Sequence, residues 1–430
     1  MIILTQIFIF LNIYGCIYGK IVVEFELFKK GEYKMEKENA KKEYLLLLLG
    51  TVITSVLCGG VGALFAHTLK LANNTFFSFN WLIYLLPLGG VLTVLLFKSL
   101  KLDSKNIHTV FSDVKNDGET PFLLSVAIFV GTAITQFFGG SAGKEGAALQ
   151  IGSGISSPIA HYLKLRYHNH KILLLCGMTA MFSAVFTAPL TALAFGLEIV
   201  YISRKFYLKA VLPLAMSSFG AYGIAMALGV HPERFALHAL PQFSAISFLK
   251  IAGLILACAV VCILFCLALH LTGDLFKKLF KSPYLRVIIG GALVIGLTLL
   301  VGNNDYNGGG MHVIERVVET GNAFYFAFLF KIIFTAITNA SGFKGGEIVP
   351  ALFVGATLGA VVGGLLGLPP SFAAAVGMVT LFGGATKCTV SAFMLGLEFF
   401  GMGGIGYFAL AAVLSRIITA NIGLYTAEHK

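Results

Sequence analysis

A series of closely spaced apolar segments is the feature of this chain that most restricts its fold. Several of these segments reach the roughly 20 residues that a helix needs to cross a bilayer. Because lipid offers no hydrogen-bond partner to the backbone, we expect each segment to be helical. The segments are 44–69, 81–99, 121–138, 171–186, 188–203, 207–229, 246–274, 286–301, 323–337, 347–366, 371–384, 389–401 and 404–419. Only 12% of the residues are charged, against roughly 25% in soluble domains, so the sequence predicts an all-α polytopic membrane protein.

Positive charge gathers in the short breaks between the apolar segments. Lys and Arg together number 31 against 20 Asp and Glu, which gives a formal net charge of +11. Much of the positive charge lies in Lys98–Lys105, Lys164–Lys171, Arg204–Lys209 and Lys277–Arg286. This pattern is the cytoplasmic-loop bias of a multi-pass protein of the cell membrane, which we expect to be a bacterial inner membrane. The positive charge of these breaks would draw anions toward the cytoplasmic side of the protein. It does not indicate nucleic acid as a partner.

The residues before the first long apolar segment are mixed in character. Residues 1–19 are apolar, but they lack the basic stretch that opens a signal peptide. A charged segment follows to Glu43, and Met35 begins a stretch that resembles a natural cytoplasmic N-terminus. We therefore expect residues 1–43 to form a cytoplasmic segment, and our hypothesis is that residues 1–34 are dispensable or a start-site artefact.

The two halves of the chain repeat one another. One set of residues recurs 200 positions further on without a gap: Gly177-Met178, Phe182, Ala192 and Gly196-Leu197-Glu198 return as Gly377-Met378, Phe382, Ala392 and Gly396-Leu397-Glu398. In addition, GGSAGKEGAALQIG at 139–152 resembles SGFKGGEIVPALFVG at 341–355, at nearly the same spacing. Agreement at one offset predicts an internal duplication. We place the membrane halves at 44–229 and 246–430, and the few residues after Tyr425 leave no room for a cytoplasmic regulatory domain.

The stretch 139–152 carries charge in an otherwise apolar region. Residues 146–160 predict a short helix, so that Glu145 stands at its N-terminus. Free N–H groups and the helix dipole favour anions at such an end. A carboxylate there can occupy the place of an anion and leave it on protonation. The alternative, an ordinary acidic cap in a turn, would be favoured only in a soluble protein. Interrupted segments in matching places of two halves are typical of a transporter's binding site.

Enzyme motifs are absent from the sequence. It contains no HExxH, no P-loop and no recognisable nucleophile–base pair, so we expect no enzyme and no cofactor. Cys258, Cys262, Cys266 and His270 fall on one face of a predicted helix. Small polarizable side chains on a packed face explain this pattern more simply than a metal site does. The seven Cys lie nearly all inside apolar segments, which does not indicate a disulfide framework.

Four motifs follow one another along the chain. They are GGSAGKEGAALQIG at 139–152, APLTALAFGLE at 188–198, GGEIVP at 345–350 and NIGLYTA at 421–427. Together with the duplication, they resemble the signatures of the CLC family of chloride channels and anion/proton exchangers, over nearly the whole chain after about Met35. The resemblance implies two inverted halves with broken and re-entrant helices around a midplane anion site. It also implies a homodimer with one anion pathway in each subunit.

The resemblance also implies roles for individual residues. Glu145 matches the family's gating glutamate, and both desolvation and a neighbouring anion favour its protonated form. Backbone N–H groups would hold the anion, those of Gly143, Lys144, Gly146 and Ala147 in the outer part and those of Glu347, Ile348 and Val349 at the centre. Tyr425 matches the family's tyrosine, whose hydroxyl faces the central anion. Without the resemblance, an aromatic residue of the membrane interface would be an equal alternative for Tyr425.

One departure from the family pattern leaves two candidates for the transported ion. The family's chloride branch has a Ser in a GSGIP motif, where this chain has Ser104–His108, with Lys105 or Asn106 in place of that Ser. Asn106 as an anion ligand, together with Glu347, is similar to the family's fluoride-exporting branch. Val349 stands where that branch commonly has Thr. Chloride and fluoride are therefore both candidates, with chloride as the general expectation.

A second departure concerns the proton path. Many exchangers of the family have two adjacent Glu at the end of the segment that closes here with Glu198, and Ile199 replaces the second. Glu198 is thus either a proton relay or a structural residue at a helix end, and its repeat mate Glu398 has the same two interpretations. Glu347 is another candidate proton site, because a carboxylate inside the membrane is by default functional.

These observations predict transmembrane transport of halide anions in exchange for protons, through a path gated by Glu145. The expected partners are chloride or fluoride, protons and the lipid bilayer. One alternative is a passive anion channel of the same fold. The other is an unrelated inverted-repeat carrier for an anionic metabolite.

Overall fold

The computed structural model describes residues 37–103, 105–116, 118–200, 204–237, 239–242 and 244–425. Within these ranges the regular elements are helices, and one isolated antiparallel bridge joins Gly143 to Gly346. Seven of the described helices are long and apolar enough to cross a membrane. The fold is therefore all-α, as the apolar segments predict. The hypothesis about residues 1–34 lies outside the described residues.

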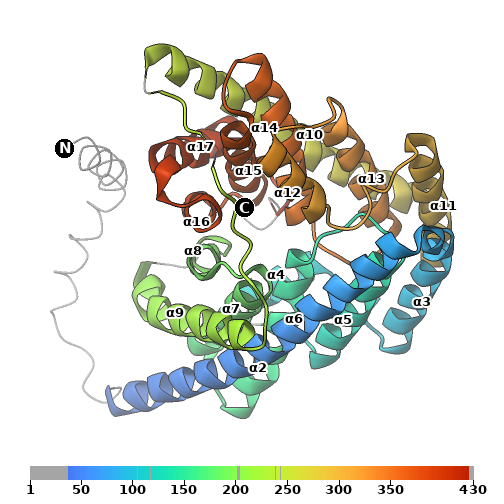
Figure 1. Ribbon diagram of the computed structural model, residues 1–430. Helices are drawn as coiled ribbons and strands as arrows, with labels where there is room; N and C mark the ends of the chain where they lie inside the picture. The colour runs from blue at the N-terminus through green and yellow to red at the C-terminus, as the bar shows by residue number, and fades with distance from the viewer. Residues whose placement is uncertain are drawn as a thin grey trace.

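The helices divide into two sets along the chain. The first set is α2 (Lys37–Ser78), η1 (Asn80–Leu85), α3 (Leu86–Ser99), α4 (Ile107–Asn116), α5 (Phe122–Phe137), α6 (Glu145–Tyr162), α7 (Tyr167–Phe186), α8 (Pro189–Glu198) and α9 (Arg204–Ala227). The second set is α10 (Ala245–Leu279), α11 (Pro283–Val301), α12 (Met311–Thr320), α13 (Ala327–Ser341), α14 (Ile348–Leu365), α15 (Pro370–Thr386), α16 (Thr389–Phe400), η2 (Met402–Gly404) and α17 (Ile405–Ile418). In Figure 1 the first set, blue to green, lies below the second set, yellow to red.

The apolar segments did not predict α4 and α12. Both helices are short and one-sided: α12 buries Val313, Ile314 and Val317, while Arg316 is half exposed. A short helix with a polar face does not read as an apolar segment, which explains why both were missed. The expected segment 188–203 is also wrong at its end, because α8 stops at Glu198.

The duplication appears in the backbone. Thr187 between α7 and α8 and Lys387 between α15 and α16 both have left-handed conformations, with φ of 54° and 66°. This conformation is rare for non-glycine residues, so its occurrence at positions 200 residues apart marks one repeated turn. Gly177 packs against α6 and Gly377 packs against α14, each where a Cβ would collide with the neighbouring backbone. The repeat predicted from the sequence is thus a structural repeat.

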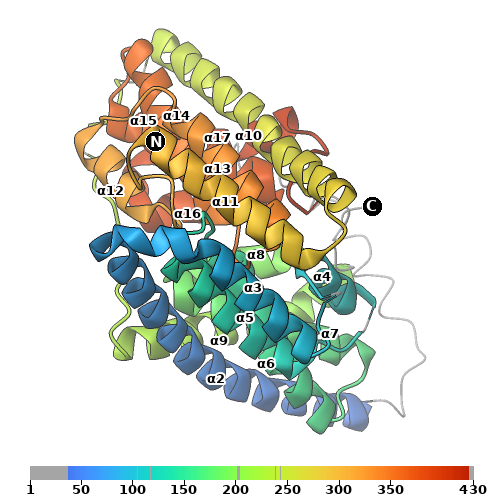
Figure 2. The ribbon, with the colours of Figure 1, turned by 90° about the vertical axis from the view of Figure 1, so that its right-hand side faces the viewer.

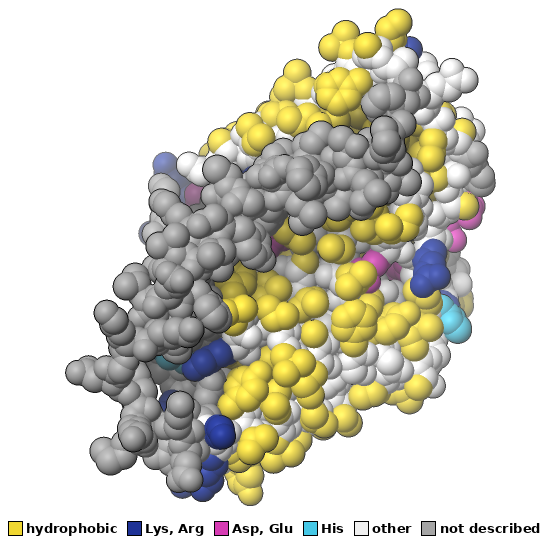
Figure 3. Space-filling model, turned by 90° about the vertical axis from the view of Figure 1, so that its left-hand side faces the viewer, with side chains coloured by type: hydrophobic (Ala, Val, Ile, Leu, Met, Phe, Trp, Pro, Cys, Tyr) yellow, Lys and Arg dark blue, Asp and Glu magenta, His cyan; other side chains and the backbone are white. Residues whose placement is uncertain are grey.

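The two halves meet along several helices. Helix α3 packs against α11, as Figure 2 shows, and α8 packs against α16. The connection from α9 to α10 crosses between the halves in Figure 1. Hydrophobic side chains cover much of the described surface on the side of α8, α9, α16 and α17 (Figure 3). Exposed apolar side chains on α9 include Leu208, Leu212 and Phe219, as expected for a surface that meets hydrocarbon.

Candidate functional site

The bridge between Gly143 and Gly346 joins the interrupted stretches of the two halves. The Gly143 N–H donates to the Gly346 carbonyl at 2.6 Å, and the Gly346 N–H donates to the Gly143 carbonyl at 2.9 Å. A Cβ on Gly146 would lie 3.1 Å from the Cα of Gly346, so the two backbones touch directly. The Gly143 N–H, which we expected to face an anion, is occupied by this bridge.

Glu145 begins α6 and lies fully inside the protein, with 0% of its surface exposed. Its Oε2 accepts the N–H of Lys144 at 3.1 Å and the N–H of Val349 at 3.3 Å. Its Oε1 is buried and has no hydrogen-bond partner. The carboxylate folds back over Gly143, where a Cβ would lie 2.6 Å from Oε2. A carboxylate from the first half therefore sits at the N-terminus of α14 in the second half.

The start of α14 is the second wall of this site. Ile348 and Val349 are buried in the first turn of the helix, where N–H groups have no partner within the helix. Glu347 precedes them as the N-cap residue, and its Oε1 accepts a hydrogen bond from the Asn339 side chain at 3.2 Å. The first turn of α6, with Gly146 and buried Ala147, faces it across the glycine bridge.

Tyr425 closes the group from the C-terminal end of the described chain. The residue is 2% exposed, and its hydroxyl is buried with no hydrogen-bond partner among the described residues. The rings of Phe111 and His108, both on α4, lie 5.1 Å and 6.4 Å from the Tyr425 ring. A buried hydroxyl without an acceptor is costly in a protein interior. This hydroxyl is therefore available to an anion.

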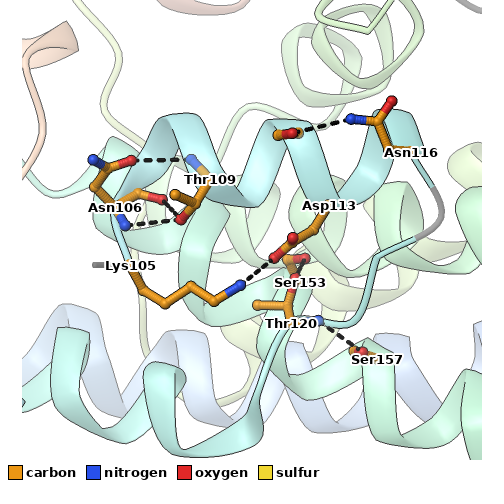
Figure 4. A network of polar contacts seen from close by, with 9 residues as sticks. Lys105, Asn106, Thr109, Asp113, Asn116, Thr120, Ser153 and Ser157 are labelled. Atoms are coloured by element: carbon orange, nitrogen blue, oxygen red, sulfur yellow. Dashed lines mark hydrogen bonds and ion pairs between the residues drawn. The ribbon is translucent and has the colours of Figure 1, made fainter. Parts of the chain in front are cut away.

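Asn106 lies at the start of α4 rather than in the buried group. The residue is exposed, and its side-chain oxygen accepts the N–H of Thr109 at 3.0 Å, which caps the helix (Figure 4). Lys105 forms an ion pair with Asp113 at 3.0 Å in the same view. The structure brings His108 and Phe111 to Tyr425 instead. Anion binding by Asn106 stays a prediction.

Lys144 has a partner that the sequence did not reveal. Its ammonium lies 3.1 Å from Oε1 of Glu233, in the connection between α9 and α10. Glu233 belongs to no motif, and only its position as a carboxylate between two apolar helices could have marked it. A second missed residue is Asn307, whose side-chain amide donates to the Gly139 carbonyl at 2.8 Å and holds the start of the signature stretch.

Glu198 and Glu398 are bound to helix ends. The Glu198 carboxylate accepts the N–H groups of Val390 and Ser391, at 3.0 and 2.9 Å. The Glu398 carboxylate accepts those of Leu190 and Thr191, at 2.8 and 2.9 Å. These bonds support the structural interpretation of Glu198 over the relay.

The cysteine face of α10 is packed inside the protein. Cys258, Cys262 and Cys266 are each 0% exposed. The ring nitrogen Nε2 of His270 lies 3.3 Å from the carbonyl of Leu424. These side chains contribute to the contact of α10 with α15 and with the segment before Tyr425.

Two inverted halves whose broken helices meet at a buried carboxylate define the class of this molecule: a polytopic membrane protein for anion transport. A family model described as "Voltage gated chloride channel" matches residues 89–420. The chain belongs to this family, the CLC proteins. The fold, the family and CLC-type transport predicted from the sequence are thereby confirmed.

Individual relatives agree with this assignment. The chain is 28% identical over 391 residues to the "Chloride/fluoride channel protein" of Pseudomonas syringae pv. tomato, which covers 89% of this chain and 86% of that protein. It is 24% identical over 286 residues to the "H(+)/Cl(-) exchange transporter ClcA" of Vibrio cholerae, over 61% of each chain.

Solved structures show the same architecture. A crystal structure of a CLC-type fluoride/proton antiporter is similar with a TM-score of 0.84 and 29% identity, over 92% of this chain and 98% of that chain. A slow cyanobacterial Cl⁻/H⁺ antiporter is similar with a TM-score of 0.76 over 89% and 96% of the two chains. At 18% identity, the second comparison shows the fold alone.

Proposed function

We propose that this protein exchanges a halide, chloride or fluoride, for protons, and that Glu145 is the gate. One observation carries the proposal: the buried Glu145 carboxylate, from the first half, accepts the Val349 N–H of the second half at 3.3 Å. A carboxylate oxygen there takes the hydrogen bond that a halide would otherwise accept. Two solved or curated relatives are described as exchanging an anion for protons, which supports the same chemistry.

The arrangement gives the gate two states. As a carboxylate, Glu145 is a strong acceptor for the N–H groups of Lys144 and Val349, and it competes with an anion for them. Protonation removes the negative charge and weakens both bonds, so the side chain yields its place. A halide then accepts from the N–H groups at the start of α14 and from the Tyr425 hydroxyl. Proton binding and anion entry are thus linked at one carboxylate.

The N–H and O–H groups at the site select for an anion without trapping it. They supply partial positive charge, whereas the full positive charge on Lys144, the residue before Glu145, is paired with Glu233. A halide held only by dipoles can leave again. The absence of a hydroxyl on Val349 reduces the donors available to a strongly hydrated ion such as fluoride. The Pseudomonas relative is named for both ions, and we propose chloride or fluoride here.

Proteoliposomes test the proposal. Purified protein should release chloride or fluoride along a gradient and drive protons uphill against it, and Glu145→Ala should abolish the proton movement. Side-by-side gradients of fluoride, chloride and nitrate identify the ion. Halide flux that is indifferent to Glu145→Ala would overturn the gate.

A passive channel of the same fold is a second candidate. Ile199 replaces the second inner glutamate, and both oxygens of Glu198 are engaged at the start of α16. Glu347, which lies at the start of α14 beside Gly146, is the proton site that exchange would require. Anion flux that never moves protons uphill would favour the channel.

We also propose an oligomeric state for the protein and the boundaries of its membrane halves. The family resemblance supports a homodimer with one pathway in each subunit, and the membrane halves at 44–229 and 246–430. Translation from Met35 should retain transport, since residues 1–34 are proposed to be dispensable. Cross-linking in membranes and the mass of the detergent-purified protein test the dimer.

A further inference from the structure

Glu233 lies beside the gate although it is distant in sequence from every motif. Its Oε1 is 3.1 Å from the Lys144 ammonium, and Lys144 directly precedes Glu145. The side chains of Lys144 and Glu233 are 19% and 27% exposed, so water screens the pair only in part. The second oxygen of Glu233, Oε2, is buried without a hydrogen-bond partner.

The backbone around Glu233 is held in place. The N–H of Phe235 donates to the carbonyl of Phe399 at 2.8 Å, and the Phe235 ring stacks on that of Phe400 at 5.6 Å. These contacts attach the connection to α16 of the second half. Lys144 belongs to the first half, so the ion pair joins the start of α6 to a connection that is attached to the second half. Glu233 therefore presents its charge to Lys144 from a fixed position.

We propose that Glu233 is a positioning residue for the gate: it neutralises Lys144, and its charge sets the pH at which Glu145 yields to an anion. This inference rests on the proposed function and deepens it. An unpaired Lys144 ammonium beside Glu145 would stabilise the gate as a carboxylate. Paired with Glu233, the ammonium exerts a much weaker net field on the gate.

Other groups around the gate do not duplicate this arrangement. Glu347 lies near the gate at the start of α14, with its Oε2 3.6 Å from where a Cβ on Gly146 would lie, and Tyr425 is another titratable group at this site. Among the described residues, the Lys144 ammonium forms its ion pair with Glu233 and not with either of these two groups. On the connection itself, Arg234 directly follows Glu233, and the Glu233 N–H donates to the Thr187 hydroxyl oxygen at 3.4 Å.

The test measures halide flux against pH in proteoliposomes for the unmodified protein and for variants that either change or keep the charges of the pair. Glu233→Gln leaves Lys144 unpaired, so the midpoint of activation should move to lower pH by about one unit. Lys144→Gln leaves Glu233 unpaired, so the midpoint should move to higher pH. The double variant restores a neutral pair and should return the midpoint toward that of the unmodified protein. Glu233→Asp and Lys144→Arg keep the charges and should keep the midpoint.

The controls separate this inference from the proposed function and from a structural role. Glu43→Gln removes a carboxylate of similar exposure, 26%, from an ion pair with Arg166, and should not move the midpoint. If the ion pair only stabilised the structure, either single variant would break it equally. The midpoint would then shift in the same direction in both variants or would not shift, and that result would overturn the inference. Flux that is indifferent to Glu145→Gln would instead overturn the gate itself.

Discussion

Glu198 and Glu398 form a reciprocal pair of helix caps between α8 and α16. Glu198, the last residue of α8, accepts N–H groups at the start of α16, and Glu398, near the end of α16, accepts N–H groups at the start of α8. The Thr191 hydroxyl adds a bond of 2.6 Å to Glu398. A helix N-terminus offers free N–H groups and positive potential, so each carboxylate meets a favourable partner. The two short helices thereby hold the halves together.

This relationship predicts that Glu198→Gln and Glu398→Gln act on stability. Gln keeps one acceptor oxygen and loses the charge, so each variant should lower the free energy of unfolding by about 1–3 kcal/mol. Thermal unfolding in detergent measures the loss, and proteoliposomes measure the number of protons moved per anion. That ratio should stay unchanged in Glu198→Gln. A lost proton coupling with unchanged stability would instead make Glu198 a relay.

Replacing Glu145 by Gln should remove the response of transport to pH. The amide resembles the protonated carboxyl in size and charge and cannot release a proton, so the gate is held in one state. Flux measured across a pH series should be flat, and uphill proton movement should disappear. Glu319→Gln, on the exposed end of α12, is a suitable control. A pH response like that of the unmodified protein would contradict the prediction.

Tyr425→Phe should weaken anion binding without lowering stability. The hydroxyl has no partner among the described residues, so its removal breaks no internal hydrogen bond. A hydrogen bond to a charged group contributes about 1.5 kcal/mol, which corresponds to about tenfold in the dissociation constant. Isothermal titration with chloride and fluoride measures it. Tyr407→Phe, whose hydroxyl lies 3.5 Å from the carbonyl of Pro241, should bind anions normally.

Val349→Thr should shift selectivity toward fluoride. Val349 is 1% exposed at the start of α14, so a Thr there would add a hydroxyl beside the N–H that Glu145 now occupies. Fluoride is small and strongly hydrated, and it gains more than chloride from an additional hard donor. The ratio of fluoride to chloride flux should rise. Val349→Ala, which enlarges the site without a donor, should not raise it.

Asp305 should make the loop after α11 sensitive to acid. The His312 side chain, and then Arg316 at 2.5 Å, hold the pKa of the Asp305 carboxyl below its ordinary value. Because the pKa is lowered in the folded state, the stabilisation is present above about pH 4 and is lost as the pH falls further. For a partly exposed pair it amounts to about 0.5–1 kcal/mol. Asp305→Asn should lack this part of the pH dependence of thermal unfolding.

Much of the fold could be predicted because it rests on local and repeated patterns. Apolar length predicted the helices that span the membrane, and the offset of 200 residues predicted the duplication, which the structure shows in the paired turns at Thr187 and Lys387. The amphipathic helices α4 and α12 were missed because their polar residues interrupt the apolar pattern, so that their sequences resemble those of loops. The position of Glu145 at a helix N-terminus was also predictable, because glycines precede it and an uninterrupted helical stretch follows.

The sequence by itself determined that this chain would be helical, duplicated and embedded in a bilayer, since hydrophobicity and periodicity are properties of neighbouring residues. Only the tertiary structure decided which groups meet. It joined Glu145 to Val349 across 204 positions and Lys144 to Glu233 across 89, and it committed Glu198 to a helix end. Such pairings depend on how the inverted halves pack against each other, and no pattern within either partner's own segment encodes them.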